Sequence, residues 1–252
     1  MSVFLISGAG SGIGAETART VALTGHTVIL LGRNFEKLVS VKSTLANSAS
    51  HSLIQADIRK KAEVQAGLKK SGLEKLDGVI ANAGVGGDNR YGSADRWQEI
   101  IDTNLTGAYI LVNECLPYLQ KGDSEFRHIL LISSILARLG APGYSAYCAS
   151  KAGLLGLMRS WASALASQKI LVNAVCPGWV DTEMARSGIA GYAAHTGKSY
   201  DEALQEQMAL VPLGKMSEPK EIAALITFLV SNQQQSITGQ TFDINNGALM
   251  PS

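Results

Sequence analysis

The stretch VFLISGAGSGIG, residues 3–14, decides the fold. Its first four residues, Val3–Ile6, are all apolar, which indicates a short buried strand. Glycines at every second position from Gly8 to Gly14 follow, and the pattern after them is helical as far as Leu23. Glycines let the main chain turn tightly, and the start of the next helix offers free N–H groups and its positive dipole end to a phosphate. The glycine pattern alone is as typical of a plain turn, but its place between a strand and a helix indicates a dinucleotide-binding unit.

Short apolar runs and longer helical patterns alternate along the rest of the chain. We expect strands at Val3–Ile6, Thr27–Leu31, Ser52–Gln55, Gly78–Ala81, His128–Ser133, Leu171–Cys176 and Gln240–Ile244. We expect helices at about Gly14–Leu23, Phe35–Ala46, Lys60–Lys70, Trp97–Leu119, Ala146–Ser167, Asp201–Met208 and Pro219–Val230. Strands this apolar are typical of a parallel sheet that helices cover on both faces. The alternation predicts an α/β Rossmann fold, a doubly wound parallel sheet, in a single NAD(P)-binding domain over residues 1–252.

One stretch departs from this alternation. Residues 182–198 are rich in Gly, Ala and Ser, and we expect them to be irregular. Such a segment between two ordered elements is either a mobile substrate lid, extending over about residues 182–212, or an ordinary surface loop. The sequence leaves both interpretations open.

Charge and composition exclude several classes of function. The formal net charge of +1 argues against nucleic acid or an anionic membrane as the main partner, because both favour a strongly basic surface. The three cysteines form no CxxC pair and the four histidines are scattered, so we expect a reducing compartment and no metal site. We see neither a signal peptide nor a membrane span, and we expect a cytoplasmic protein.

The choice of cofactor depends on the end of the second expected strand. That strand runs into Leu31-Gly32-Arg33-Asn34 and carries no acidic residue at its tip. An acid there commonly binds the ribose 2′-hydroxyl of NAD, whereas an Arg accommodates the 2′-phosphate of NADP. Arg33 therefore predicts NADP(H), with NAD(H) as the alternative if Arg33 is only a solvated surface charge.

The sequence Tyr147-Cys148-Ala149-Ser150-Lys151 begins a predicted helix. Residues four apart share one helix face, so the Tyr147 phenol and the Lys151 ammonium should point into the same space. A tyrosine pKa near 10 is too high for proton exchange at neutral pH, and a nearby cation lowers it. The pair is a candidate general acid/base, although many helices carry the same spacing as a solvated surface pair.

Polar residues also follow other expected strands. Ser133 and Ser134 end one strand, Asn82-Ala83-Gly84 follows another, and Pro177-Gly178 follows a third. Ligands bind beyond the carboxyl ends of the strands in an open parallel sheet. These segments should therefore meet in one crevice, where a serine hydroxyl holds a substrate carbonyl or merely ends its strand.

In order and spacing, these motifs resemble those of the short-chain dehydrogenase/reductase family over essentially the whole chain. The resemblance implies that Tyr147 protonates the alkoxide in reduction or deprotonates the alcohol in oxidation. It implies that Lys151 lowers the tyrosine pKa and binds the nicotinamide ribose. It also implies that Ser134, rather than Ser133, orients the carbonyl, and that Asn104 supports a proton relay through a water near Lys151.

The motifs and the resemblance together give a set of cofactor-binding residues. The set is Gly8, Gly10, Ser11, Gly12, Ile13, Gly14, Arg33, Asn34, Asp57, Ile58, Asn82, Ala83, Gly84, Tyr147, Lys151, Pro177, Gly178, Val180 and Thr182. Within it, the resemblance implies that Asp57 meets the adenine and that Val180 and Thr182 bind the carboxamide. It further implies a homo-oligomer, a tetramer or dimer, with Trp97–Leu119 and Ala146–Ser167 at interfaces.

The chain departs from the family pattern at three positions. Ser7 stands where Thr is usual, and Ala137 replaces a common Gly. Ser11 stands where many NADP-binding members carry a basic residue, which leaves Arg33 as the only basic cue for NADP(H).

The stretch from Pro177 to Lys215 is most similar to the 3-oxoacyl-carrier-protein and polyketide ketoreductase branch. The leading hypothesis is a carbonyl reductase that transfers a hydride between NADP(H) and a ketone or secondary alcohol. The alternatives are an NAD-dependent secondary alcohol dehydrogenase, a non-catalytic cofactor sensor, and a sugar-nucleotide epimerase or dehydratase. The intact set Asn104, Ser134, Tyr147 and Lys151 argues against the sensor, and the chain has no room for the epimerases' separate substrate domain.

Overall fold

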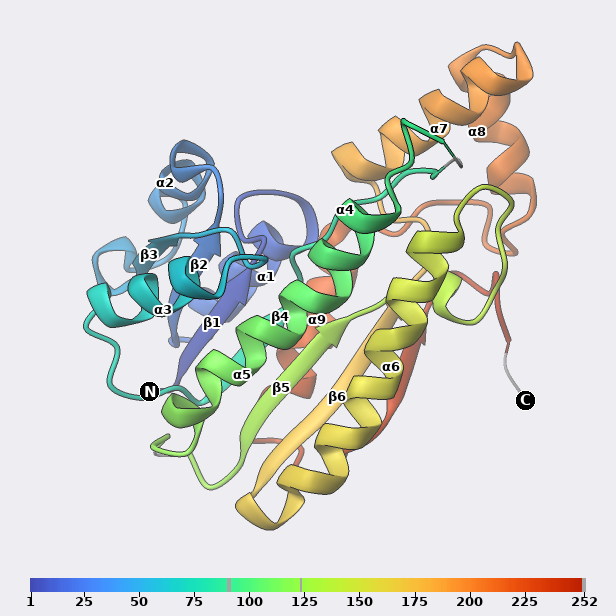
Figure 1. Ribbon diagram of the computed structural model, residues 1–252. Coiled ribbons are helices and arrows are strands. Elements are labelled where there is room, and N and C mark those ends of the chain that lie inside the picture. Colours follow the sequence, from blue (N-terminus) through green and yellow to red (C-terminus); the bar gives the residue numbers. More distant parts are fainter. Residues whose placement is uncertain (90–91, 123, 251–252) are drawn as a thin grey trace.

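Seven parallel strands form one sheet at the centre of the protein (Figure 1). The computed structural model describes residues 1–89, 92–122 and 124–250. Within them the strands are β1 (Val3–Ser7), β2 (Thr27–Gly32), β3 (Ser52–Gln55), β4 (Gly78–Ala81), β5 (Arg127–Ile132), β6 (Ile170–Pro177) and β7 (Thr241–Ile244). Their order in the sheet is β3-β2-β1-β4-β5-β6-β7. The chain runs outward from β1 to β3 and then crosses back to β4 beside β1, so the predicted doubly wound Rossmann fold is confirmed.

Helices cover both faces of the sheet. They are α1 (Gly12–Leu23), α2 (Phe35–Ser43), α3 (Lys61–Lys70), α4 (Trp97–Ile101), α5 (Gly107–Leu119), α6 (Ser145–Leu165), α7 (Glu183–Thr196), α8 (Tyr200–Ala209) and α9 (Pro219–Leu229). Helices α3, α5 and α6 pack on one face, and α1, α2 and α9 on the other. No helix among the described residues is both long and apolar enough to cross a bilayer.

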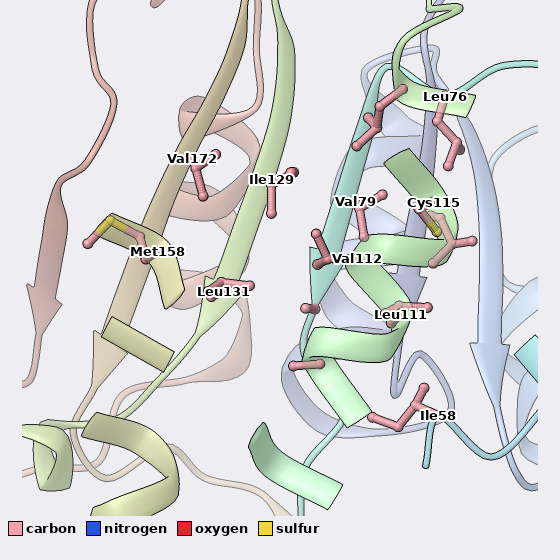
Figure 2. Close-up of a cluster of buried hydrophobic side chains, with 14 of the residues drawn as sticks. Ile58, Leu76, Val79, Leu111, Val112, Cys115, Ile129, Leu131, Met158 and Val172 are labelled. Atoms are coloured by element: carbon pink, nitrogen blue, oxygen red, sulfur yellow. The ribbon is translucent and has the colours of Figure 1, made fainter. Parts of the chain in front are cut away.

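The strands alternate their side chains between two hydrophobic clusters. Leu5, Val79 and Ile129 belong to the cluster under α5 and α6, part of which Figure 2 shows. Ile6 and Ile80, one position further along their strands, belong to the cluster under α1 and α9. Both clusters are almost wholly excluded from solvent. This burial on both faces explains why the strands are continuous apolar runs rather than alternating patterns.

The expected irregularity of residues 182–198 is wrong, because α7 occupies most of this segment. The Thr182 side chain caps the helix by accepting a hydrogen bond from Ala185 N at 3.3 Å. Ala185, Ile189 and Ala193, spaced four apart, give α7 a buried face. Alanine favours helix more than any other residue, so the composition that suggested a loop is compatible with a helix. Ile189 and Ala193 pack against Ala203 of α8, and the two helices share a small cluster of their own.

The long helix expected over Trp97–Leu119 is interrupted. Helices α4 and α5 are joined by one π turn, Asp102–Thr106, which holds Asn104. A π turn inserts a residue into the helix and changes the direction of the side chains around it; such turns are frequent at functional sites. Two other helices are shorter than expected: α2 ends at Ser43 and α6 at Leu165, each followed by tighter turns.

Candidate active site

The glycine turn between β1 and α1 is built from positions that tolerate no side chain. Gly8 and Gly12 have φ of 67° and 52°, in the left-handed region that glycine adopts without strain. A β-carbon at Gly14 would lie 2.3 Å from the Gly8 carbonyl oxygen. The turn therefore lets a ligand approach the main chain closely, as a pyrophosphate requires.

The start of α1 fits an anion. Within the described part of the chain, the side chain of Ser11, the residue just before the helix, makes no capping hydrogen bond, and the first turn holds no acidic residue. The N–H groups of that turn are thus available to a phosphate. Ile13 packs against the core below, and a β-carbon at Gly12 would lie 3.1 Å from Thr182 Cγ2. The predicted residues of the turn and Thr182 are therefore brought together, and they fit a dinucleotide.

The end of β4 is fastened to this turn. Ser7 Oγ accepts hydrogen bonds from the N–H groups of Asn82 and Ala83, at 3.1 and 3.0 Å. Asn82 Nδ2 donates to the Ser7 carbonyl at 3.0 Å. Because the hydroxyl makes these bonds, the replacement of the family's Thr by Ser7 preserves the link. A β-carbon at Gly8 would lie 2.8 Å from Ala83 Cα, so the two segments are in direct contact.

Asn104 holds the loop that follows β4. Its Oδ1 accepts from Val85 N at 2.8 Å, and its Nδ2 donates to the Val85 carbonyl at 3.0 Å and to Ser150 Oγ at 3.2 Å. A β-carbon at Gly84 would lie 3.1 Å from Asn104 Oδ1 and 3.5 Å from Lys151 Nζ. Asn104 is thus a neighbour of Lys151, and its side chain orders the loop between them.

The structure distinguishes the two serines after β5. Ser133 Oγ donates to the carbonyl of Lys151 at 2.8 Å and so binds β5 to α6. Ser134 Oγ accepts from Leu136 N at 3.1 Å and is hydrogen-bonded to the Tyr147 side chain. Ser134 therefore lies beside the phenol, as the family spacing implied, whereas Ser133 serves the main chain.

Tyr147 and Lys151 face the same space, with Lys151 Nζ 5.6 Å from the centre of the tyrosine ring. The Lys151 ammonium donates to the Ile132 carbonyl at 2.8 Å, and burial lowers its pKa to about 8. Burial raises the pKa of Tyr147 to about 12, against an opposite effect of its hydrogen bond with Ser134. Burial thus dominates, and the pKa of Tyr147 lies above its usual value, whereas the sequence predicted that it would lie below it. A phenol that keeps its proton is suited to donate it to a developing alkoxide.

Another group of predicted residues lies where β2 and β3 end. Arg33 is exposed, and its carbonyl accepts from Gln55 Nε2 at 3.1 Å. Asn34 caps α2 by accepting from Lys37 N at 2.9 Å. A pocket of about 440 Å³ opens beside Arg33, at the end of the site formed by β2 and β3 rather than at the tyrosine.

Asp57 and Ile58 also lie at this end, but their side chains are already engaged. Arg59 binds the Asp57 carboxylate through Nε and Nη2, the latter at 2.5 Å, and thereby lowers the pKa of that carboxyl. Ile58 is buried, and a β-carbon at Gly107 would lie 2.8 Å from its Cδ1. A contact between the Asp57 carboxylate and an adenine thus competes with Arg59. The spacing of Arg59, two positions after Asp57, is the feature of the sequence that could have predicted this ion pair.

The segment after β6 supplies the remaining predicted contacts. Pro177 ends β6, and Gly178 N donates to the Ile244 carbonyl at 3.0 Å, so this turn is fixed to β7. Val180 forms a bridge with Ser217. The predicted contacts at Val180 and Thr182 therefore come from the start of α7, next to Gly12.

No group of three or more metal-ligating side chains occurs in residues 1–89, 92–122 and 124–250. The cysteines there are free thiols, with Cys115 and Cys176 buried and Cys148 half-buried. Polar chemistry at the carboxyl edge of the sheet thus comes from hydroxyl, amide and ammonium groups. Sequence reasoning missed three polar residues around it. Lys37 and Asn89 make contacts between separate segments, whereas Arg59 pairs with Asp57 two residues before it, a spacing that the sequence does show.

A glycine turn of this kind beside a paired tyrosine and lysine defines an NAD(P)-dependent oxidoreductase that acts on C=O and CH–OH groups. The family model described as "Enoyl-(Acyl carrier protein) reductase" matches residues 8–248. The chain belongs to the short-chain dehydrogenase/reductase family, as its motifs implied.

Relatives and solved structures agree with this assignment. The 3-oxoacyl-[acyl-carrier-protein] reductase FabG of Rickettsia felis is 34% identical over 249 residues, which cover 98% of this chain and 96% of the relative. The crystal structure of an actinorhodin polyketide ketoreductase variant with NADPH matches with a TM-score of 0.89 and 30% identity, over 98% of this chain and 97% of that chain. The crystal structure of levodione reductase matches with a TM-score of 0.87 and 26% identity, over 98% of this chain and 96% of that chain.

Proposed function

We propose that this protein is an NADP(H)-dependent ketone reductase whose substrate is a 3-oxoacyl thioester or a related ketone. The observation that carries the proposal is the meeting of Ser134, Tyr147, Lys151 and Asn104 beside the glycine turn. Similarity to a 3-oxoacyl-[acyl-carrier-protein] reductase and to a polyketide ketoreductase supports the substrate class.

In the proposed reaction the ketone gains one hydride and one proton and becomes a secondary alcohol. Bound NADPH supplies the hydride. The Tyr147 hydroxyl donates the proton to the carbonyl oxygen, and the Ser134 hydroxyl binds the same oxygen and orients it. Lys151 holds a positive charge near the tyrosine, which stabilises the phenolate left behind. Asn104 keeps the loop beside Lys151 in place.

We propose that two cations, Arg33 and Lys37, select NADP(H). Lys37 lies in the first turn of α2, and its Cβ would be 3.2 Å from a β-carbon at Gly10. Its ammonium lies 3.5 Å from a Glu183 carboxylate oxygen at the start of α7, so it reaches across the glycine turn. Lys37 thus brings a positive charge to the glycine turn from another segment, in a chain that lacks the family's basic residue at Ser11.

Titration with NADPH and, separately, NADH tests this choice. A bound 2′-phosphate contacts only the cations that face it, so Arg33→Met and Lys37→Met should weaken NADPH binding about 10-fold each and leave NADH binding unchanged. Lys42→Met, in the last turn of α2, is the matched control. Equal or tighter binding of NADH by the unmodified protein would favour the second candidate function, an NAD-dependent secondary alcohol dehydrogenase. The exposure of Arg33 is the observation that supports this candidate.

We further propose that α7 and α8, within residues 182–212, form the substrate lid. These helices have a hydrophobic cluster of their own, which suits movement as a unit. Met184 of α7 lies against the loop after β4, since a β-carbon at Gly86 would be 2.9 Å from its sulfur. Hydrogen exchange of α7 and α8 should slow on addition of cofactor and substrate if this segment closes over them.

The proposal includes a cytoplasmic homo-oligomer, a dimer or tetramer, assembled through α5 and α6. Tyr109 of α5 is 49% exposed, and its ring stacks on Trp161 of α6 with centroids 6.1 Å apart. Light scattering of the purified protein and of Tyr109→Glu tests the assembly, because a charge in an aromatic contact should dissociate it.

A further inference from the structure

The catalytic helix begins without a capping side chain of its own. Tyr147 is the third residue of α6, and the N-terminal flanking residue, Tyr144, makes no side-chain capping hydrogen bond among the described residues. First-turn N–H groups have no partner inside a helix, and a helix start that lacks a cap is less stable. The position of the Tyr147 hydroxyl depends on this turn, so something else must hold it.

Asn89, from the loop after β4, supplies the missing cap. Its Oδ1 accepts from Ala146 N at 2.9 Å and from Ser145 Oγ at 3.2 Å. Its own N–H donates to the Gly143 carbonyl at 2.8 Å, just before the helix. The side chain is buried, with 6% of the residue exposed. A buried amide with these bonds holds both the start of α6 and the turn that leads into it.

A second contact fixes the orientation of the Asn89 amide. Its Nδ2 donates to Asp95 Oδ1 at 3.3 Å, and the same oxygen accepts from Trp97 N, at the start of α4, at 3.1 Å. A flipped amide would direct its NH2 group at Ala146 N and its oxygen at a carboxylate. Only the observed orientation makes all the bonds, so Oδ1 is held toward α6.

The loop that carries Asn89 is the one that connects the rest of the site. It starts at Asn82, which is hydrogen-bonded to the glycine turn, passes close to Lys151 at Gly84, and is bonded to Asn104 at Val85. Asn89 ends this path at the catalytic helix. The loop thus transmits the position of the cofactor-binding turn and of Lys151 to the first turn of α6.

We propose that Asn89 is a positioning residue that caps α6 from another segment and fixes the Tyr147 hydroxyl relative to Ser134 and Lys151. The inference rests on the proposed function, because it takes Tyr147 as the proton donor. Asn89 touches no reacting atom; it acts through the main chain of Ala146 and the hydroxyl of Ser145.

The test compares kcat, KM and NADPH affinity in Asn89→Ala and in an exchange variant. Asn89→Ala should lower kcat by about 10- to 100-fold, the size expected when a catalytic group is misplaced by about 1 Å. NADPH affinity, measured by quenching of tryptophan fluorescence, should stay within about 2-fold, because the glycine turn and Arg33 are intact. Asn89→Asp alone should also lose activity, since two carboxylates would then face each other.

The exchange variant, Asn89→Asp with Asp95→Asn, gives the sharpest result. It swaps the amide and the carboxylate, so an oxygen again faces Ala146 N and a donor again lies between the two side chains. The bond from Trp97 N is lost, because the Asp95 oxygen that accepts it becomes an NH2 group. A kcat at least about 5-fold above that of Asn89→Asp supports positioning through Ala146 and Ser145. A kcat no higher than that of Asn89→Asp, in a protein that unfolds at the temperature of the unmodified enzyme, would overturn it.

Two controls separate this inference from a loss of stability and from the proposed function. Asn173 is another buried asparagine whose side chain bonds two main-chain groups, the Ile237 carbonyl and Gln240 N, away from Tyr147. Asn173→Ala should lower the melting temperature without changing kcat below it. An equal fall in kcat in Asn89→Ala and Asn173→Ala would overturn positioning. Full turnover in Tyr147→Phe would instead overturn the proposed function, whatever Asn89→Ala does.

Discussion

The two ends of the β-sheet carry similar polar residues for different purposes. At the amino end, the residues directly before β1 to β4 are Ser2, His26, His51 and Asp77. At the carboxyl end, Ser134, Tyr147 and Lys151 meet next to the glycine turn.

The difference lies in what the polar atoms bind. The Asp77 carboxylate accepts from Val3 N at 2.8 Å and from Ser124 N at 2.9 Å. His51 Nδ1 accepts from Val28 N at 3.0 Å, and its Nε2 bonds the Ala46 carbonyl at 2.8 Å. These side-chain atoms hold main-chain groups in place, so the amino end should contribute to the stability of the fold. At the carboxyl end, the Tyr147 side chain lies against the side chains of Ser134 and Lys151, so that end should contribute turnover.

Gly14→Ala should have the largest effect, and it acts on the carboxyl end. A β-carbon there would lie 2.3 Å from the Gly8 carbonyl oxygen and 2.5 Å from Asn82 Nδ2, so the turn must change shape. We expect a loss of NADPH affinity of about 100-fold or more and a fall in stability of about 3 kcal/mol. Gly156→Ala is the control, because a β-carbon in that part of α6 meets nothing within 4 Å. NADPH titration and urea unfolding measure both, and unchanged NADPH affinity in Gly14→Ala would show that the turn does not hold the cofactor.

Asp77→Ala should affect the amino end alone. It removes two hydrogen bonds to a buried charged acceptor, and we expect a loss of about 4 kcal/mol in the free energy of unfolding. The value of kcat below the unfolding transition should stay within about 2-fold. Asp77→Asn keeps an acceptor and should lose less stability. A large fall in kcat in a folded Asp77→Ala protein would contradict the assignment of stability to the amino end and turnover to the carboxyl end.

Stability should also fall in acid because of the amino end. His128, the second residue of β5, is 3% exposed, and neither of its ring nitrogens has a hydrogen-bond partner among the described residues. Burial lowers its pKa to about 4, against a smaller opposite effect of Asp77. In the unfolded chain the His128 ring is therefore protonated below about pH 6.5, whereas in the folded protein it is protonated only below about pH 4. The free energy of unfolding is therefore unaffected by His128 above pH 6.5. It decreases as the pH falls below that value, by up to about 3 kcal/mol at pH 4.

Urea unfolding between pH 7 and pH 4 checks this prediction. His128→Leu removes the titrating group and should show a weaker loss of stability over the same range. Parallel curves for the two proteins would mean that His128 does not cause the acid sensitivity.

The two adjacent serines sharpen the comparison within one edge. Ser133→Ala should cost about 1 kcal/mol of stability through its lost bond to the Lys151 carbonyl, with kcat nearly unchanged. Ser134→Ala should cost a similar amount of stability through its lost bond from Leu136 N, and in addition lower kcat about 10-fold, since it removes a group that binds the substrate oxygen. A fall in kcat in Ser133→Ala and none in Ser134→Ala would mean that Ser133, not Ser134, faces the substrate.

The sheet and the site motifs were predictable because their signals are local. Each buried strand is an apolar run in the sequence, and the glycine turn and the Tyr147 to Lys151 spacing lie within a few residues. Helix α7 was not predicted, because its glycines and serines are typical of a loop. The four-residue spacing of Ala185, Ile189 and Ala193 is the local signal for its buried face.

Other features depend on contacts that no local pattern contains. The cap that Asn89 gives to α6 joins segments 57 residues apart. The π turn around Asn104 interrupts a stretch whose sequence predicts one continuous helix. The pKa of Tyr147 is raised because folding buries the phenol, whereas the sequence shows only the neighbouring lysine.

Turnover of Tyr147→Phe with a 3-oxoacyl thioester is the most direct test of the central claim, that the carboxyl end of the sheet is a reductase site with Tyr147 as its proton donor. Oxidation of NADPH in the presence of acetoacetyl thioester would be followed together with NADPH affinity in the same samples. We predict that the unmodified protein consumes NADPH and forms the alcohol in equal amounts, and that Tyr147→Phe binds NADPH equally well while its kcat falls by about 10²- to 10⁴-fold. Turnover by Tyr147→Phe at the rate of the unmodified protein would contradict the account.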